Sequence, residues 1–389
     1  MNRRWPLLWI IGLVVLTATV HWPSLQNGFI WDDDDHFTEN PAMTSPDGLR
    51  QIWTTLAVSR YYPLTLTTFW VQQRLWGLNP MLHHAVNIVL HAASAVLIFA
   101  LLRKLQVRGA WAAAAIWAVH PVMVESVAWA TELKNTQSGV FFFLSLLLFL
   151  KSEERARYGW YVLALACAAA ALLSKPSAVI LPLVLLLCVW WKRRRIGWAD
   201  LLRAVPFLAL SAGMSLLTIA EQRGHIERGV QDWSLTSPER LIVAGKALWF
   251  YAVKLLWPVN LTFVYARWDN DVRSVGSWLP VLATLAIGVW LWSVRRHQWA
   301  RVSLFGLGYF VIGLLPVLGF YDVYYFRYSF VADHFQYLAA VGIIALASAG
   351  VAAAVSNRTA KRVCFAGVVV ALGVLSWRHA QVFYDDETL

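Results

Sequence analysis

Four consecutive carboxylates stand in a loop after the first apolar stretch of the chain, in the segment Trp31-Asp32-Asp33-Asp34-Asp35-His36. Mutual repulsion is expected to raise the pKa of some of these carboxylates toward a value useful for proton transfer. They cannot lie in hydrocarbon, although the chain around them is apolar. The run is therefore either an acidic loop exposed to water or a source of a catalytic carboxylate at a membrane surface.

Other polar residues recur near the ends of apolar runs. Asn87 and His91 are four residues apart and share one helix face, and Lys175 lies in a short turn between two long apolar runs. Each alone has an ordinary explanation, since a single histidine often bonds a neighbouring helix and a lysine often reaches toward the membrane surface. Together they suggest a site for a substrate with a lipid tail and an anionic head. The other candidates are His120, Glu125, Glu132, Lys134, Asn135, Lys254, Arg327, Asp333 and His334.

A mostly apolar chain carries these residues. Of its 389 residues, 59% are hydrophobic and only 14% are charged, and its mean hydropathy is +0.54, whereas soluble domains average about 25% charged residues. Apolar runs of roughly 17–20 residues, long enough to cross a ~30 Å hydrocarbon core, recur along it. The sequence therefore predicts an all-α polytopic membrane protein. We expect eleven transmembrane helices, at residues 5–22, 84–102, 109–120, 136–150, 159–174, 177–191, 203–220, 278–294, 302–319, 337–355 and 362–378.

Basic residues set the expected orientation, because cytoplasmic loops are enriched in Lys and Arg. Arg3-Arg4 precede the first span, which we interpret as an uncleaved signal anchor with a cytoplasmic N-terminus. The apolar segment 241–258 carries Lys246 and Lys254, so we expect it to be interfacial or re-entrant on the outer side. The net charge of +11 then reflects topology and not nucleic-acid binding. Five basic clusters fall on the cytoplasmic side: Arg103-Lys104 with Arg108, Lys151 with Arg155 and Arg157, Lys192 to Arg195, Arg295-Arg296 with Arg301, and Arg358 with Lys361-Arg362.

The expected outer side holds nearly all the acidic residues. Only Glu153, Glu154 and Asp200, of 22 Asp and Glu, fall on the cytoplasmic side, although acidic residues were not used to set the orientation. We therefore expect the working surface and the C-terminus to be extracytoplasmic. The largest outer loops are 23–83, with an amphipathic interfacial helix after Tyr62, and 221–277.

No linker or low-complexity tract divides the chain, and we interpret residues 1–389 as one membrane domain. The three cysteines lie inside apolar runs and show neither a disulfide framework nor a metal spacing.

Several stretches together resemble a known family. The resemblance is to the multi-spanning half of the transmembrane and tetratricopeptide-repeat O-mannosyltransferases and their bacterial relatives, which have the GT-C fold. It covers residues from about 25 to 345. The stretches are Asn27 to Asp33 with Asn40-Pro41; Tyr62 to Thr65 and Gly77 to Pro80 with His84, Asn87 and His91; His120-Pro121 and Glu125 to Trp129 with Ser174-Lys175; and Trp257 to Leu261 with Tyr265 and Ala332 to Leu338.

The resemblance implies an inverting glycosyltransferase in a bacterial inner membrane. A carboxylate of the first outer loop, Asp32 or Asp33, would be the general base toward an acceptor hydroxyl, and the donor would be a polyprenyl-phosphate sugar, with mannose the sugar expected from this family. Bacterial relatives often carry arginine near Leu133 and eukaryotic ones carry it where His334 stands, so the family's phosphate contacts do not transfer directly. The family usually continues into tetratricopeptide repeats, which would begin after residue 389 and which we expect this sequence to lack. The implied donor-phosphate and substrate residues are His120, Glu125, Lys134, Lys175, Lys254, Arg327, Asp333 and His334, with Asn87, His91 and Tyr62 in support.

Alternatives stay open at this stage. The acceptor is either a protein Ser or Thr hydroxyl, or a lipid or cell-wall glycan. A non-enzymatic transporter of lipid-linked sugar or solute is a third alternative, although no inverted repeat is apparent. We expect no resident metal, because four adjacent carboxylates on a regular backbone cannot all face one ion.

Overall fold

The structure is a computed structural model that describes residues 4–55, 61–155, 157–226 and 235–389, and within these ranges it contains helices and no strand. The α-helices are α1 (Arg4–Val20), α2 (Asp33–His36), α3 (Pro41–Thr44), α4 (Gly48–Thr54), α5 (Pro63–Trp76), α6 (Pro80–Lys104), α7 (Ala110–Ala118), α8 (Val124–Ala128), α9 (Leu133–Arg155), α10 (Tyr158–Ser174), α11 (Leu181–Arg193), α12 (Trp198–Ile226), α13 (Ser237–Leu256), α14 (Val275–Ser293), α15 (Gln298–Leu314), α16 (Ala340–Ala354) and α17 (Arg358–Ala380). The 3₁₀ turns are η1 (Trp22–Gln26), η2 (Pro121–Met123), η3 (Ala130–Glu132), η4 (Pro176–Ile180), η5 (Leu315–Val317), η6 (Tyr324–Arg327), η7 (Asp333–Gln336) and η8 (Gln381–Phe383).

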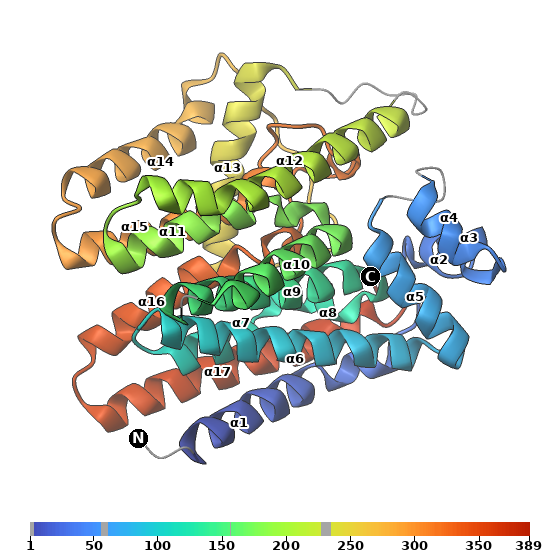
Figure 1. The fold of residues 1–389 in the computed structure, drawn as a ribbon, viewed down its shortest axis with the longest axis horizontal. Coiled ribbons are helices and arrows are strands. Elements are labelled where there is room, and N and C mark those ends of the chain that lie inside the picture. The colour runs from blue at the N-terminus through green and yellow to red at the C-terminus, as the bar shows by residue number, and fades with distance from the viewer. Residues whose placement is uncertain (1–3, 56–60, 156, 227–234) are drawn as a thin grey trace.

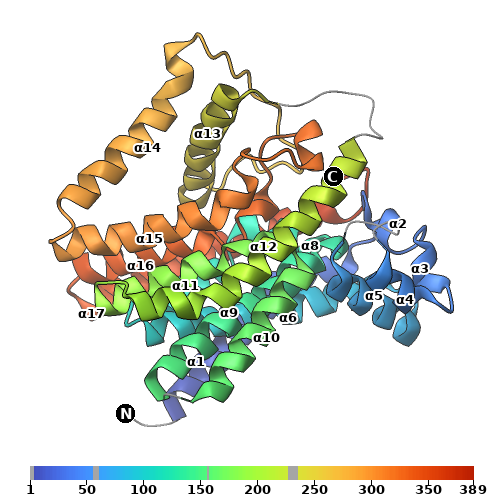
Figure 2. The same ribbon diagram turned by 45° about the horizontal axis from the view of Figure 1, so that its top comes forward.

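Most long helices lie side by side along the longest axis of the molecule and form a bundle with two unlike ends (Figure 1). The basic end carries the connections 105–109, 194–197, 294–297 and 355–357. At the loop end lie the short helices α2 to α5 and the C-terminal residues (Figures 1 and 2). The bundle therefore separates the basic clusters from the acidic loop at residues 31–36.

Every one of the eleven predicted spans falls on an apolar helix. Among the described residues, seven helical segments are long and apolar enough to cross a membrane, and α7 with η2 and α8 forms an eighth if this bent pair is one span. Three further apolar helices, α1, α10 and α16, are shorter. The prediction of an all-α polytopic membrane protein is confirmed, while the number of eleven crossings stays a prediction.

The predicted span 109–120 is interrupted. Helix α7 ends at Ala118, and the chain turns by 56° before η2 and α8. Pro121 cannot donate a backbone hydrogen bond to the preceding turn, and it instead takes the first position of η2. His120 caps that turn, because its side chain accepts a hydrogen bond from the Val122 amide. The break turns the chain toward the loop end, where the candidate residues of α8 and η3 lie.

Helix α13 is the segment that we expected to be interfacial or re-entrant. It contains Lys246 and Lys254 and is not among the helices apolar enough to span. It also carries two charged residues, Glu239 and Arg240, close to its start. Figures 1 and 2 both show it running across the direction of the bundle. Its membrane placement stays a prediction, and its direction differs from that of the spanning helices.

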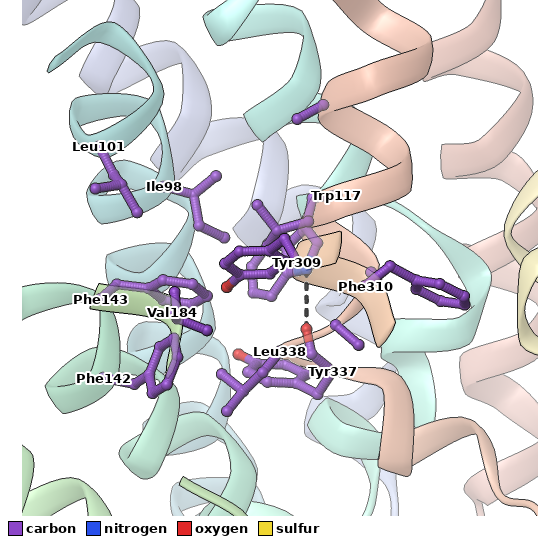
Figure 3. Packing of buried hydrophobic residues seen from close by; sticks show 14 of the residues in the cluster. Ile98, Leu101, Trp117, Phe142, Phe143, Val184, Tyr309, Phe310, Tyr337 and Leu338 are labelled. Carbon is purple, nitrogen blue, oxygen red and sulfur yellow. Dashed lines mark hydrogen bonds between the residues drawn. The ribbon is translucent and has the colours of Figure 1, made fainter. Parts of the chain in front are cut away.

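Helix α9 lies at the closely packed centre of the bundle. In its most apolar stretch, 72% is buried inside the structure. Figure 3 shows Trp117 of α7 donating its indole N–H to the Tyr337 carbonyl oxygen at 3.2 Å, with Phe142 and Phe143 of α9 nearby. Tyr337 also lies so close to Gly139 that a Cβ there would be 2.8 Å from its ring. This contact fixes the position of residues 333–337 along the axis of α9.

Candidate functional site

Asp33 anchors the acidic loop to the segment before α9. Its side chain is fully buried, and its Oδ1 atom accepts a 2.7 Å hydrogen bond from the Thr131 amide and a short one from the Thr131 hydroxyl. Its Oδ2 atom accepts a hydrogen bond from the Ile30 amide at 3.0 Å. Burial raises the pKa of Asp33 to about 7, the hydrogen bonds from Thr131 and Ile30 oppose the shift, and the charge of Asp32 adds to it. Repulsion, the cause expected from the sequence, is therefore secondary to burial.

Asp32 is arranged differently. It is half-buried, and its Oδ1 atom is enclosed yet accepts no hydrogen bond from the part of the chain that the structure describes. Its backbone oxygen accepts a 2.7 Å hydrogen bond from Nδ1 of His36. Since that nitrogen donates, Nε2 of His36 accepts the short hydrogen bond from the Tyr62 hydroxyl. Asp34 and Asp35 are exposed, so one carboxylate of the run, that of Asp32, has an enclosed and unused acceptor atom.

The acidic loop is also held by the last part of the chain. The Gly28 amide donates to the Tyr384 carbonyl oxygen at 2.9 Å, and the Trp31 amide donates to Oδ1 of Asp386 at 3.0 Å. The Asn27 side chain donates to the Ala380 carbonyl oxygen at 3.2 Å. Trp31 has a positive φ of 53°, which an L residue adopts only when its surroundings stabilise it.

A second buried carboxylate lies beside the first. Glu132 has a side chain that is 0% exposed, and it contacts the ammonium groups of Lys134 at 2.8 Å and Lys175 at 3.2 Å. Asn135 donates a further hydrogen bond to it at 2.5 Å. Two ammonium groups thus share one carboxylate, so this group carries a net positive charge. Burial lowers the pKa of Lys175 to about 8, and the charge of Glu132 opposes that shift.

Residues 333–337 approach the same place from the other side of the bundle. The carboxylate of Glu125 accepts hydrogen bonds from the His334 amide at 2.8 Å and from its Nδ1 atom at 2.7 Å. Nε2 of His334 lies 4.0 Å from Oε1 of Glu132. The Asn135 side chain closes the group, because it also donates to the His334 carbonyl oxygen at 2.9 Å. Helix α8 is therefore joined to turn η7 through the Glu125 carboxylate, and α9 is joined to it through the Asn135 amide.

Two aromatic rings connect the acidic loop with the lysines. The ammonium group of Lys134 lies 5.2 Å from the centre of the Trp129 ring and 6.0 Å from that of Tyr62. Tyr62 bonds to His36, which in turn bonds to the backbone of Asp32. The structure thus brings together Asp32, Asp33, Tyr62, Glu125, Lys134, Lys175 and His334 from the set predicted by sequence.

Asp333 and Lys254 form a neighbouring group. The Tyr265 hydroxyl donates to Oδ2 of Asp333 at 3.0 Å, and Lys254 lies 5.2 Å from the centre of the Tyr265 ring. Burial and the charge of Glu125 raise the pKa of Asp333 well above its usual range. Lys254 also donates to the carbonyl oxygens of Val259 and Asn260, at 2.7 and 2.8 Å, and so stabilises the end of α13.

The remaining predicted residues have other contacts. Asn87 donates to the carbonyl oxygens of Trp129 and Ala130. His91 bonds the Ala118 carbonyl oxygen and the Tyr337 hydroxyl, both at 3.0 Å, and His120 bonds the Leu255 carbonyl oxygen at 3.0 Å. These three side chains hold the backbone around the site. Arg327 is exposed, 3.3 Å from the Tyr324 hydroxyl, and is not part of the buried group.

The sequence did not single out Thr131 or His36 as site residues, although both are central to the geometry. Thr131 is an uncharged residue 98 positions from Asp33, so its role has no local signal in the sequence. His36 directly follows the acidic run, and this position is a signal that could have been used. Within the described residues, no group of three or more His, Cys, Asp or Glu could hold a metal ion.

Comparison with known proteins identifies relatives in sequence. Residues 66–219 match the family described as Dolichyl-phosphate-mannose-protein mannosyltransferase. The chain is 31% identical over 152 residues to Protein O-mannosyl-transferase TMTC3 of Mus musculus, covering 36% of this chain and 16% of that protein. It is 27% identical over 160 residues to Protein O-mannosyl-transferase F38B6.6 of Caenorhabditis elegans, covering 37% and 23%. Part of the chain is therefore similar to the O-mannosyl-transferases, and the matched part spans less than a quarter of the length of these two proteins.

Among solved structures, the chain is similar to ArnT from Cupriavidus metallidurans bound to undecaprenyl phosphate. The TM-score is 0.45 and the sequence identity is 14%, over 97% of this chain and 76% of that one.

Proposed function

We propose that this protein is a membrane glycosyltransferase of the GT-C type. It moves a sugar, mannose in the first instance, from a polyprenyl-phosphate donor to a hydroxyl group of a protein Ser or Thr. The observation that carries the proposal is that Asp33 of the acidic loop bonds to Thr131, next to Glu132, a buried carboxylate shared by Lys134 and Lys175. The relatives named as protein O-mannosyl-transferases support both the sugar and the acceptor.

Asp32 is the general base of the proposed reaction. Asp32 is only half-buried, and its Oδ1 atom accepts no hydrogen bond from the described residues, so this carboxylate is better placed than that of Asp33 to take the proton of an acceptor hydroxyl. As the proton moves to Asp32, the acceptor oxygen bonds to the anomeric carbon, and the bond from that carbon to the phosphate oxygen breaks. Attack opposite to the leaving group inverts the anomeric configuration.

Asp33 has a positioning role in this proposal. Both of its carboxylate oxygens accept hydrogen bonds, from Thr131 and Ile30, and its side chain has no exposed surface. It therefore has less access to an acceptor than Asp32 does. By tying the loop to residues 130–132, Asp33 sets the distance between Asp32 and the lysines.

Lys134 and Lys175 bind the donor phosphate in this proposal. Their net positive charge suits a phosphate that gains negative charge as the glycosidic bond breaks. His334 is the next candidate, since its Nε2 atom lies 4.0 Å from the carboxylate of Glu132. Lys254 and Asp333 lie in the neighbouring group and would border the donor site. Arg327, at the surface, would contact the acceptor or the solvent and not the phosphate.

The orientation is part of the proposal. The basic end faces the cytoplasm of a bacterium with the N-terminus, and the loop end faces the extracytoplasmic side of the inner membrane with residues 380–389. The separation of the basic clusters from the acidic loop along the bundle supports this placement (Figure 1).

The test is transfer of labelled mannose from purified polyprenyl-phosphate mannose to a Ser/Thr-rich peptide. General-base catalysis contributes about 10²–10⁴-fold, so Asp32→Asn is expected to lower kcat by about 10³-fold while donor binding is retained. Asp35→Asn, at an exposed position of the same run, is the matched control and is expected to keep its activity.

Equal activity of Asp32→Asn and Asp35→Asn would overturn the assignment of the base. Transfer to a lipid or glycan, but to no peptide, would move the acceptor to the other class. Absence of any transfer by the unaltered protein, together with uptake of labelled solute into liposomes, would instead support a transporter.

A further inference from the structure

A cavity of about 570 Å³ opens in the bundle far from the acidic loop. Helices α15 and α16 form its floor and α6 and α11 contribute walls, and it reaches the connections at the basic end. Gly306 of α15 and Gly342 of α16 line its inner part, where a Cβ on Gly342 would stand 2.4 Å from the Gly306 carbonyl oxygen. Toward the basic end, small residues of α16, among them Ala345, Ala349 and Gly350, leave the space unfilled.

The mouth of this cavity is polar and basic. Gln106, Arg108, His297 and Gln298 line it, and Arg108 and His297 are exposed. No ion pair of Arg108 occurs within the ranges that the structure describes. The mouth therefore presents hydrogen-bond donors and a positive charge at the point where an apolar cavity meets the end of the bundle.

Acidic residues at the basic end are all used elsewhere. Glu154 pairs with Lys104 at 2.6 Å and with Lys192 at 2.9 Å. Glu153 pairs with Arg203 at 2.6 Å, and Arg193 pairs with Asp200 at 2.6 Å. These pairs hold all three carboxylates of the basic end beside cations of α6, α11 and α12. The mouth, between α7 and α15, is left without a protein counter-charge among the described side chains.

The inner end of the cavity contains an unused hydrogen-bonding group. Tyr309 lines the cavity and is only 4% exposed, and its hydroxyl has no partner among the described residues. An acyl chain cannot accept a hydrogen bond from this hydroxyl, so Tyr309 marks the inner end of the cavity and does not itself identify an occupant. Figure 3 shows Tyr309 among the buried hydrophobic residues that pack together in the bundle.

The length of the cavity limits which molecule could occupy it. Eleven residues of helix separate Gln298 at the mouth from Tyr309, which corresponds to roughly 16 Å of helix at ~1.5 Å per residue. That is about half of a ~30 Å hydrocarbon core, the depth of one leaflet and of one acyl chain. A polyprenyl chain is longer than one leaflet.

We propose that this cavity is a binding site for an anionic glycerophospholipid. The lipid phosphate lies at the mouth against Arg108 and its polar neighbours, and one acyl chain follows α15 and α16 toward Tyr309. Charge at the mouth and the single-leaflet length together select this occupant over a zwitterionic lipid or a polyprenyl phosphate. The site is at the opposite end of the bundle from the acidic loop and does not depend on the proposed transfer reaction.

The test is native mass spectrometry of the full chain released from nanodiscs that contain equal amounts of phosphatidylglycerol and phosphatidylcholine with the same acyl chains. The unaltered protein is expected to retain phosphatidylglycerol preferentially. A basic side chain near an anionic lipid contributes about 1 kcal/mol, so Arg108→Gln is expected to weaken this preference roughly fivefold. Arg358→Gln, another basic-end residue that does not line the cavity, is the control and is expected to behave as the unaltered protein does.

A second pair of variants tests the part of the cavity that is proposed to hold the acyl chain. Ala349→Phe places a ring in the cavity and is expected to remove lipid retention, whereas Ala347→Phe, on the exposed side of the same helix, is expected to have no effect. Arg108 is at the surface, so its variant remains informative if Ala349→Phe fails to fold. Equal retention of the two lipids by the unaltered protein, or an Ala349→Phe variant that folds and retains lipid, would overturn the proposal. So would displacement of phosphatidylglycerol by equimolar added undecaprenyl phosphate.

Discussion

Asp33 and Glu132 are both fully buried, and both side chains meet the segment 130–135, yet their surroundings are opposite in kind. Asp33 accepts hydrogen bonds from uncharged donors, the amide and hydroxyl of Thr131 and the amide of Ile30. Glu132 contacts two ammonium groups. Dipoles offset only part of the cost of burying a charge, whereas a neighbouring cation offsets much more of it.

Because their surroundings differ, the carboxyl groups of Asp33 and Glu132 have different roles within one site. A carboxyl group held by neutral donors can gain or lose a proton near neutral pH without leaving a buried cation unpaired. Glu132, by contrast, keeps two lysines together, and its own protonation would leave them to repel each other. Asp33 therefore fixes the position of the loop while remaining titratable, and Glu132 concentrates positive charge.

The largest expected effect comes from removing the charge that sets Glu132 apart. Glu132→Gln leaves Lys134 and Lys175, whose side chains are 8% and 14% exposed, without a shared carboxylate. Removal of one partner of a buried ion pair costs about 3–5 kcal/mol. We expect the free energy of unfolding in detergent to fall by about 3 kcal/mol, measured by thermal or denaturant unfolding.

Glu154→Gln is the matched control for this change. Glu154 also contacts two lysines, Lys104 and Lys192, but its side chain is 47% exposed. Exposed pairs contribute at most about 1 kcal/mol, so the control is expected to lose little stability. A loss as large as that of Glu132→Gln would show that burial is not what distinguishes the two carboxylates.

An intermediate effect is expected on binding of the donor phosphate. Lys175→Met preserves most of the side-chain volume and removes one charged donor, which contributes about 1.5–3 kcal/mol to a hydrogen bond. Affinity for polyprenyl-phosphate mannose is therefore expected to fall by roughly 10–100-fold, as measured by titration calorimetry. Lys104→Met, at the basic end, is expected to leave the affinity unchanged.

The pH dependence of donor binding gives a second test of the role of Lys175. Since the pKa of Lys175 is lowered to about 8, the unaltered protein is expected to lose donor affinity as the pH rises through that value. A variant without this ammonium group loses that step. Binding that is independent of pH between 7 and 9 in both proteins would remove Lys175 from the phosphate site.

A pH-dependent effect is expected from the proton on Asp33. Its pKa is raised from 3.8 to about 7 in the folded protein, so between these values the folded state binds more protons than the unfolded state. Stability is therefore full at acidic pH and falls as the pH rises toward 7, with a slope of at most ~1.4 kcal/mol per pH unit. Unfolding of the unaltered protein and of Asp33→Asn, followed from pH 5 to 7.5, measures this slope.

The amide introduced by Asp33→Asn cannot titrate, so the variant is expected to show a flatter profile over this range. Two parallel profiles would mean that Asp33 has the same pKa in the folded and unfolded states.

The helices were predictable from the sequence, and much of the site was not. Apolar length is a local property, which is why each of the eleven expected spans falls on a helix. The interruption before Pro121 was not predicted, although a proline at that place is a local signal for it. Lys246 and Lys254 were sufficient to predict that α13 differs from the helices apolar enough to span a membrane.

Partnerships across the chain have no comparable signal. Glu132 and Lys134 are near neighbours in sequence, but Lys175 joins them from 43 positions away. Asn87 and His91 share a helix face as expected, but whether such side chains meet a ligand or a backbone oxygen depends on the helices packed against them. In the structure both bond to protein groups.

The contact between Trp31 and Asp386 joins residues 355 positions apart. At a synthesis rate of about 5–20 residues per second, Asp386 is made roughly 20–70 s after Trp31. During that interval the first loop has already been produced, but the carboxylate that accepts from the Trp31 amide and the Tyr384 carbonyl oxygen that bonds to Gly28 do not yet exist. The acidic loop therefore reaches its final conformation only after α17 has been inserted, and partly synthesised chains lack an assembled site.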